Sequence, residues 1–377
     1  CGNACGHCGD SSTLSGLDLP LEDIRNLLAS GYFDLPYKTF INDEVRSRLI
    51  EMGYTDRDFR KTLLAGGGDP FQYGDFLGLI SVISEFISDI EIFTGGINGT
   101  VAPEMLRRAK EMMGGFGKSK LAVTVSYHPF GDRIHEYKIK RTLGILKESG
   151  VINPILLKVM VFSEESAAKV TSEERARFPF LTRSEFVGTE FYRWLHDNFR
   201  FADEIMMEFE LHLRSDAGVP DKTKPVLYLL MHSNGLREMG RACGLPKCLT
   251  AGNITQEKVL GFMESVERIN KGTELRVTPY GFITGCESSR FPRAEMYEGD
   301  LYGHSYDEIV HNRILFVGHL KDETYRWFGS GRKSEQGSMC DTVCARAREA
   351  FVRDKRRIQS HRGKGNTILR TKRVLFG

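Results

Sequence analysis

The first 216 residues of the chain alternate between short apolar runs and longer amphipathic runs. Runs typical of buried strands occupy Thr62–Ala65, Ile90–Thr94, Leu121–Ser126, Ile155–Phe162 and Glu204–Leu211. Between them, apolar residues recur at intervals of three and four residues, which is the spacing of an amphipathic helix. Strands separated by helical crossovers form parallel sheets. The pattern therefore predicts an α/β fold whose parallel strands are mostly apolar on both faces.

The alternation weakens after a stretch rich in glycine, proline and lysine at Ser215–Pro225, which we interpret as a domain boundary. We therefore divide the chain into residues 1–216, residues 217–345 and a basic segment at residues 346–377. The middle part is expected to be a smaller α+β domain, with a strand at Val226–Met231, a helix at Glu257–Asn270 and a hairpin that turns at Tyr280–Gly281.

The composition is that of a globular protein. The chain has 377 residues, 41% of them hydrophobic, which is enough for one large core or for a medium domain and a smaller one. It contains no apolar window of roughly eighteen residues, the length that a membrane span requires. No signal peptide is visible either. We expect a cytoplasmic protein that does not bind membranes.

The cysteines, eight in number, fall into two groups, at positions 1 to 8 and 243 to 344. A chain of this length does not need disulfides to hold a core, so the grouping favours metal binding in a reducing compartment. The first group, in "CGNACGHC", brings Cys1, Cys5 and Cys8 together. Three thiolates do not complete a structural zinc site, whereas on a [4Fe–4S] cluster they leave one iron open to a small molecule. A zinc site completed by His7 or by a distant residue is the alternative.

The opening motif resembles the CxxxCxφC signature of radical S-adenosylmethionine enzymes, with His7 in the position usually held by an aromatic residue. In that family the three cysteines hold a [4Fe–4S] cluster whose open iron binds the amino and carboxylate groups of S-adenosylmethionine. One-electron reduction cleaves this cofactor to methionine and a 5′-deoxyadenosyl radical, which abstracts hydrogen from a substrate. The resemblance implies a partial (β/α)6 TIM-type barrel with its chemistry at the carboxyl ends of the strands. It also implies a first strand upstream of Cys1.

Later motifs are similar to further cofactor-binding positions of this family. "LLAGGGDPF" is similar to the GGE motif that contacts the amino group of the cofactor, with Asp69 in place of glutamate. "IFTGGING" is similar to the TNG turn, and Ser126 matches a polar position that often contacts the ribose or the carboxylate. An ordinary strand-to-helix turn and an ordinary strand-end hydroxyl are the alternatives. The resemblance thus assigns cofactor contacts to His7, Gly67, Gly68, Asp69 and Ser126. It assigns substrate or cofactor contacts to Glu208 and Arg214, with Glu210 as the alternative to Glu208, because one of the two glutamates must face the interior of the barrel.

The second cysteine group resembles the auxiliary-cluster region of the SPASM/twitch proteins of the same superfamily. Cys248 precedes "LTAG", Gly281 and Cys286 form G-x4-C, and Cys340 and Cys344 form CxxxC. The central CxxC of the full pattern is absent, so the resemblance implies one auxiliary [4Fe–4S] cluster and a smaller C-terminal α+β iron-sulfur domain. The implied ligands are Cys248, Cys286, Cys340 and Cys344, with Cys243 as an alternative ligand. A four-cysteine zinc knuckle is the structural alternative.

The last segment is strongly basic. Residues 346–373 contain eleven lysines and arginines against Glu349 and Asp354, a net charge of +9 in a chain whose total is +2. The rest of the chain therefore carries −7. Such a segment suits RNA or an acidic peptide, or it is a solvated helix and tail. Because only Phe351 and Phe376 accompany the charges, stacking on nucleic-acid bases is not indicated.

The sequence thus predicts a radical S-adenosylmethionine enzyme that modifies a peptide, a protein or a small molecule. Its partners would be this substrate and a one-electron reductant such as flavodoxin or ferredoxin. One alternative is an RNA-modifying enzyme of the same superfamily that uses the basic segment. The other is a non-catalytic zinc-binding interaction protein with two cysteine knuckles.

Overall fold

The computed structural model describes residues 18–29, 51, 61–64, 69–97, 101–114, 120–129, 133–152, 155–177, 179–201, 226–232, 254–255, 276–278, 281–284, 294–330, 334–335 and 343–362. The chain divides into two compact units, Cys1–Ala251 (unit 1) and Gly252–Gly377 (unit 2). Each unit has a hydrophobic core of its own. None of the helices in this described part is both long and apolar enough to cross a membrane.

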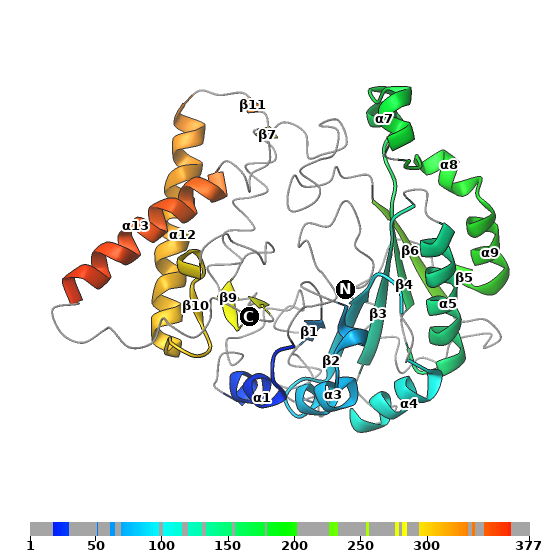
Figure 1. Cartoon of the computed structure of the whole chain (residues 1–377), viewed down its shortest axis with the longest axis horizontal. Coiled ribbons are helices and arrows are strands. Elements are labelled where there is room, and N and C mark those ends of the chain that lie inside the picture. The colour runs from blue at the N-terminus through cyan, green and yellow to red at the C-terminus, as the bar shows by residue number, and fades with distance from the viewer. Residues whose placement is uncertain are drawn as a thin grey trace. The chain divides into compact units, whose positions relative to one another are not determined.

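Unit 1 contains a six-stranded sheet in which every pair of neighbours is parallel (Figure 1). The order across the sheet is β1 (Lys61–Leu64), β2 (Asp89–Thr94), β3 (Lys120–Tyr127), β4 (Ile155–Met160), β6 (Val226–His232) and β5 (Arg200–Phe201). The predicted α/β class is confirmed, and strands β1 to β4 lie within a few residues of their predicted positions. The strand predicted at Glu204–Leu211 lies outside the described residues.

Strand β6 extends the sheet beyond the boundary that we placed at residue 216. Strand β6 pairs with β4 over Val226–His232. The short β5 pairs with the other edge of β6. Leu227, Leu229 and Met231 alternate along β6 and add their side chains to the core of the sheet. This burial explains why the strand belongs to the sheet although it follows a stretch rich in glycine and proline.

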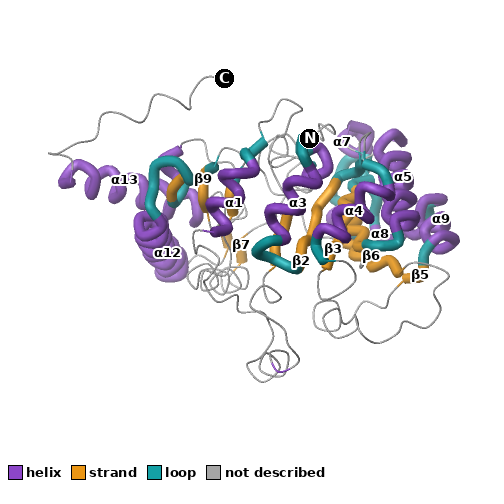
Figure 2. The backbone as a smooth tube through the Cα atoms, turned by 90° about the horizontal axis from the view of Figure 1, so that it is seen from below, coloured by secondary structure: helices purple, strands orange, loops and turns teal. Residues whose placement is uncertain are grey.

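The helices of unit 1 precede or connect these strands. They are α1 (Leu21–Ala29), η2 (Pro70–Gln72), α3 (Phe76–Ser84), α4 (Pro103–Met112), α5 (Arg133–Ser149), α6 (Glu164–Ala168), α7 (Ser172–Arg177), α8 (Arg183–Val187) and α9 (Glu190–Asn198). Helices α3, α4, α5 and α9 lie along one side of the sheet, and α1 packs beside α3 (Figure 2). The apolar run at Ser184–Phe199 forms two helices, because Gly188 ends α8 and the Thr189 hydroxyl caps α9.

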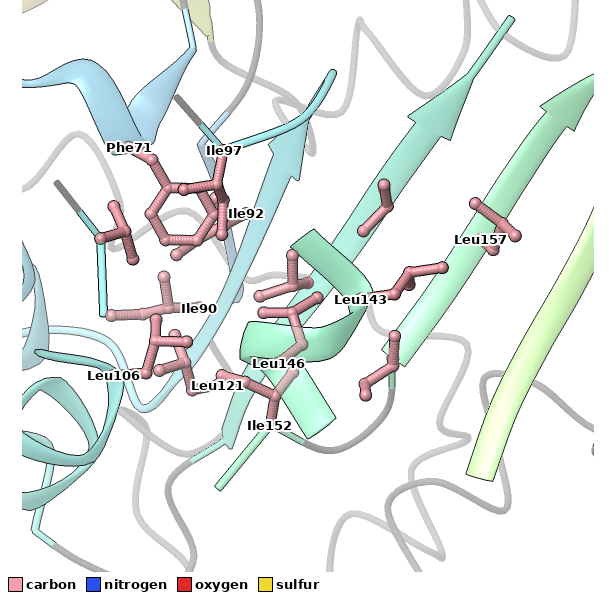
Figure 3. Close-up of a cluster of buried hydrophobic side chains, with 14 of the residues drawn as sticks. Phe71, Ile90, Ile92, Ile97, Leu106, Leu121, Leu143, Leu146, Ile152 and Leu157 are labelled. Carbon is pink, nitrogen blue, oxygen red and sulfur yellow. The ribbon is translucent and has the colours of Figure 1, made fainter. Parts of the chain in front are cut away.

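The core of unit 1 is formed where this helical layer covers the sheet. Alternate residues of neighbouring strands, such as Ile92, Leu121 and Leu157, meet Leu106 of α4 and Leu143 of α5 (Figure 3). All five side chains are at most 1% exposed. The period of two along each strand therefore delivers one apolar row per strand to the helices.

The residues between these rows face the other side of the sheet. This second face includes Glu91 of β2, Thr124 and Ser126 of β3, and Lys158 of β4, and we call it the polar face. Ser126 and Lys158 are partly exposed, whereas Glu91 and Thr124 are buried. This face is mixed, because it also carries Phe93, Leu156 and Met160, so the expectation of strands that are mostly apolar on both faces holds fully for the side that the helices cover and in part for the other.

Unit 2 combines short antiparallel strands with two long helices. Strands β8 (Arg276–Val277), β9 (Phe282–Thr284) and β10 (Gly299–Asp300) form one sheet, and β7 (Ile254–Thr255) pairs with β11 (Ser334–Glu335). The predicted hairpin is confirmed: β8 and β9 are antiparallel, and Gly281 adopts a φ of 76° at the turn. A Cβ at Gly281 would lie 2.6 Å from the ring of Tyr302, so glycine is required there. The helix predicted at Glu257–Asn270 lies outside the described residues.

Two helices, α12 (Tyr306–Gly329) and α13 (Ala345–Arg362), form the core of unit 2 with η4 (Ala294–Met296). Phe316, Leu320 and Trp327 of α12 pack with Ala347 and Phe351 of α13. Helix α12, with its capping box at Ser305, was not predicted from the sequence. The first part of the predicted basic segment is thus a helix whose apolar side belongs to the fold of unit 2.

Candidate functional site

Three neighbouring strands of unit 1 end at the same edge of the sheet. Asp69 follows β1 in the chain, Thr94 ends β2, and Ser126 is next to the last residue of β3. The parallel registers of β1, β2 and β3 place their carboxyl ends side by side. Ligands of parallel α/β proteins bind at this end of the strands. The edge is therefore the candidate functional site of unit 1.

Asp69 is 7% exposed, and its carboxylate accepts hydrogen bonds from neutral donors. Oδ2 accepts from the Thr94 hydroxyl at 2.7 Å and from the Gly95 backbone N–H at 3.3 Å. Oδ1 accepts from the Phe71 backbone N–H at 3.1 Å and so caps η2. Burial raises the pKa of Asp69, and these hydrogen bonds oppose the rise. Among the described residues Oδ1 accepts one hydrogen bond, which is fewer than the two that a carboxylate oxygen can accept.

The turn after β2 is held by its own hydroxyl and by helix α5. The Gly96 N–H donates to the Thr94 Oγ1 at 3.1 Å, and the Ile97 N–H donates to the Thr142 Oγ1 at 2.8 Å. Gly96 has a φ of 120°, and a Cβ there would lie 3.3 Å from the Cβ of Lys138. Glycine is therefore required at position 96, and the rigid turn presents the Gly95 amide to Asp69.

Sequence reasoning missed His135 of α5, which lies at the same edge. Its Nε2 is 3.1 Å from the carbonyl oxygen of Gly95, and its Nδ1 is 3.4 Å from the carbonyl oxygen of His128. The ring also lies against Tyr127, with 5.7 Å between the ring centroids. The helical pattern of α5 gives no signal for this residue, because only the packing of α5 against the strand ends reveals its partners.

The polar face contributes a second set of groups near this edge. Ser126 and Lys158 lie opposite each other in the register of β3 and β4. Neither side chain has a hydrogen-bond partner in the described part of the chain. Further from the edge, the Thr124 hydroxyl donates to Glu91 at 2.7 Å. Ser126 was predicted, whereas Lys158 and Glu91 were not. The alternation of inward and outward side chains along β2 and β4 could have identified Glu91 and Lys158, since each of them lies between two apolar residues that face the helices.

In unit 2, Cys344 is the predicted metal ligand that the described residues include. It is 6% exposed and packs in the apolar cluster of α12 and α13. Residues 343–344 form a π-helical turn that leads into α13. A thiolate at the start of a helix is stabilised by the helix dipole, although apolar surroundings oppose its ionisation. This position fits a metal-bound thiolate and also an ordinary buried thiol.

One helical turn beyond Cys344, Arg348 is buried in the same unit. It donates to Glu298 at 3.0 Å, to the Met296 carbonyl oxygen at 2.8 Å and to the Thr284 hydroxyl at 3.3 Å. Its guanidinium also lies over the ring of Phe316, 3.3 Å from the ring centroid. Arg348 therefore joins α13 to α12, to β9 and to the segment before β10.

The cations of α13 divide between the interior and the surface. Lys355 donates to the Tyr297 carbonyl oxygen at 3.3 Å, and burial lowers the pKa of its ammonium. Arg356 pairs with Glu295, whereas Arg346, Arg353 and Arg357 are exposed. Part of the basic character that suggested an electrostatic partner thus serves the fold.

The remaining predicted site residues lie outside the described part of the chain. They are Cys1, Cys5, His7, Cys8, Gly67, Gly68, Glu208, Arg214, Cys243, Cys248, Cys286 and Cys340. Among the residues that are described, no group of three or more His, Cys, Asp or Glu side chains could hold a metal ion. The structure therefore brings Asp69 to Thr94 and Gly95, with Ser126 one strand away at the same edge.

Comparison with known proteins does not assign the chain to a family. No protein-family model matches the sequence. A search of curated proteins likewise finds no significant match. The resemblance described above therefore depends on the motifs themselves.

Proposed function

We propose that the chain is a radical S-adenosylmethionine enzyme. The observation that carries the proposal is the triplet Cys1, Cys5 and Cys8, whose number and spacing suit a [4Fe–4S] cluster with one open iron. When bound, this cluster and S-adenosylmethionine together supply a 5′-deoxyadenosyl radical that abstracts hydrogen from a substrate.

The architecture of unit 1 supports a partial barrel as the scaffold. Its strands are parallel, and those of its helices that the structure describes pack on one face. This is the arrangement of a (β/α) barrel wall, whereas an open doubly wound sheet has helices on both faces. The exchanged positions of β5 and β6 differ from the sequential strand order of a complete barrel. The polar face would then be the inner face of the partial barrel.

Residues at the carboxyl edge suit the charged groups of S-adenosylmethionine. Asp69 would hold the amino group, since a cation offsets the cost of burying a carboxylate whose described donors are all neutral. The Lys158 ammonium and the Ser126 hydroxyl would hold the carboxylate or the ribose. Gly67 and Gly68 would allow the cofactor to approach the backbone closely, because glycine has no Cβ. Contacts from His7, Glu208 and Arg214 are predicted from the resemblance alone.

The test is anaerobic reconstitution of the full chain, with assays of iron, sulfide and zinc and of reductive cleavage of S-adenosylmethionine to 5′-deoxyadenosine. We expect the triple variant Cys1→Ala, Cys5→Ala, Cys8→Ala to lose the cleavage and about four irons per chain. The matched control, Cys344→Ala, should retain the cleavage because it leaves the opening motif intact. Stoichiometric zinc without cleavage would contradict the proposal and favour the zinc-binding interaction protein.

An auxiliary [4Fe–4S] cluster is the second part of the proposal. Its ligands would be Cys248, Cys286, Cys340 and Cys344, or Cys243 in place of one of them. The buried position of Cys344 at the start of α13 suits a thiolate ligand shielded from water. Two clusters correspond to about eight irons per chain, and Cys344→Ala should reduce this to about four. Iron content that does not respond to Cys344→Ala would remove the auxiliary cluster from the proposal.

The substrate would be a peptide, a protein or a small molecule, and the electrons would come from flavodoxin or ferredoxin. The described basic residues give an RNA substrate less support than their number suggests, because Arg348 and Lys355 are engaged in the interior of unit 2. Cleavage assays with flavodoxin or ferredoxin as the reductant test this partner directly.

A further inference from the structure

His135 lies between the ends of two strands and faces a backbone carbonyl from each. Its Nε2 approaches the Gly95 oxygen after β2, and its Nδ1 approaches the His128 oxygen after β3. Carbonyl oxygens only accept hydrogen bonds, so the ring must be the donor in both contacts. A neutral imidazole donates from one nitrogen and an imidazolium from both. Only the imidazolium therefore hydrogen-bonds to both carbonyl oxygens at once and joins the two strand ends, whereas a neutral ring donates to one of them and only contacts the other.

Each of these carbonyls belongs to a segment that carries a candidate cofactor residue. The N–H of the same Gly95 donates to Asp69. Asp69 therefore binds the amide group of Gly95, and His135 contacts its carbonyl oxygen. His128 follows Ser126 by two positions at the end of β3. The side chain of His135 therefore connects the Asp69 side of the edge to the Ser126 side.

The backbone ladder joins β2 to β3 as far as the pair Thr94 and Val125, and the side chains of Thr94 and Thr142 do not extend this connection beyond it. Thr142, also on α5, holds the turn of β2 through Ile97 and otherwise donates to the Lys138 carbonyl oxygen of its own helix. Thr94 binds Asp69 and Gly96, both on the β2 side. Among the side-chain hydrogen bonds of these three residues, those of His135 alone span β2 and β3.

We propose that His135 is a positioning residue that sets the separation of Asp69 and Ser126 and thereby the affinity of the site for S-adenosylmethionine. The inference rests on the proposed function, because it concerns the same cofactor. It assigns His135 no contact with the cofactor and no part in the chemistry. Loss of the bridge would loosen the segments that follow the last ladder pair of β2 and β3, Thr94 and Val125, and would weaken binding rather than abolish folding.

The test is the dissociation constant of S-adenosylmethionine for the anaerobically reconstituted full chain, measured by equilibrium binding without reductant. We expect His135→Phe to raise this constant about tenfold, which corresponds to about 1.4 kcal/mol. The matched control is His196→Phe, because His196 is an exposed histidine of α9 that does not contact the strand ends of the site. It should leave the constant unchanged.

Two polar substitutions separate positioning from a general loss of packing. The amide nitrogen of His135→Gln can reach the Gly95 oxygen in the manner of Nε2, but it leaves the His128 oxygen without this donor. The shorter amide of His135→Asn replaces only Nδ1 and cannot reach Gly95. Each variant keeps one half of the bridge, so both should bind S-adenosylmethionine more weakly than the wild type. Both variants keep a polar side chain, so they decide the question even where His135→Phe folds poorly.

The outcomes distinguish this inference from the proposed function. A wild-type chain that binds no S-adenosylmethionine would overturn both. A wild-type chain that binds it, with His135→Phe and His135→Asn equal to the wild type, would overturn the role of His135 alone. Wild-type affinity in either His135→Gln or His135→Asn would also contradict the bridge, since it would show that one of the two contacts is not needed.

Discussion

Unit 1 and unit 2 each bury a carboxylate, but they satisfy it in different ways. Asp69 in unit 1 accepts hydrogen bonds from one hydroxyl and two backbone N–H groups, and in the described part of the chain no cation contacts it. Glu298 in unit 2 is fully buried, and its charge is met by Arg348 at 3.0 Å. Within the described part of the chain, Asp69 is thus held by hydrogen-bond dipoles, whereas Glu298 is neutralised by a cation inside the fold.

This difference separates a carboxylate suited to binding from one suited to stability. Neutral donors orient Asp69 without cancelling its charge, and burial raises its pKa because the ionised form is poorly solvated. An arriving cation would therefore relieve a cost that the fold has left in place. Glu298 has no such need, since its ion pair with Arg348 is already complete. The following predictions test this contrast, from the largest expected effect to the smallest.

Removal of the cation in unit 2 should be strongly destabilising. Arg348→Met leaves Glu298 as a buried, uncompensated charge, and we expect unit 2 to lose about 3–5 kcal/mol of unfolding free energy. Since the chain has two tryptophans, denaturation of a Trp194→Phe background, monitored at Trp327, reports on unit 2 alone. The double variant Arg348→Met, Glu298→Leu should recover most of the loss. An unchanged midpoint in the single variant would mean that the ion pair does not support the fold.

Removal of a neutral donor in unit 1 should have a smaller effect. Thr94→Val keeps the shape of the side chain but deprives Asp69 of its hydroxyl donor and Gly96 of its acceptor. We expect a loss of about 2 kcal/mol, monitored at Trp194 in a Trp327→Phe background. Thr94→Ser, which keeps the hydroxyl, is the control and should restore most of the stability. Equal losses in both variants would point to packing rather than to the hydrogen bonds.

The pH dependence of stability should reveal the cost of ionising Asp69. Because its pKa is raised in the folded protein, its contribution is most favourable below the unfolded pKa and is lost as pH rises through the folded pKa. Stability of the wild type relative to Asp69→Asn should therefore fall as pH rises above the usual pKa range of aspartate. Urea midpoints of the two proteins, monitored at Trp194, measure this difference. A difference that is constant with pH would show that Asp69 does not titrate as burial requires.

The smallest effect is expected for an arginine on the same helix as Arg348. Arg356 pairs with Glu295 at the surface, and both side chains are about half exposed. Arg356→Gln should change the unfolding free energy of unit 2 by about 0.5 kcal/mol or less, because solvent screens exposed ion pairs. The same Trp327 assay applies. A loss as large as that of Arg348→Met would remove the distinction between buried and exposed cations of α13.

The sequence predicted the elements of unit 1 better than their arrangement. Periodicity located β1 to β4 and most of the helices, because a buried strand and an amphipathic helix have different spacings of apolar residues. It did not show that β6 inserts beside β4, because strand order depends on pairing between distant segments. In unit 2 the hairpin at Gly281 was found from its local turn chemistry, whereas α12 was missed.

The residues of the candidate site also fall into two groups, those that the sequence identified and those that only the tertiary structure revealed. Asp69, the glycines after Thr94 and Ser126 could be named from the sequence, because each belongs to a short motif at the end of a strand. Lys158 shares the polar face with Ser126 only through the register of β3 and β4. His135 reaches Gly95 from a position 40 residues away, and Arg348 reaches Glu298 from 50 residues away.

The sequence alone therefore determined the α/β class, the strand-end motifs and the cysteine groups, because these depend on local spacing and residue chemistry. The tertiary structure decided which buried charge is neutralised and which is not. It also decided which backbone carbonyls His135 joins. Those choices depend on contacts between segments far apart in the chain, and no local pattern encodes them.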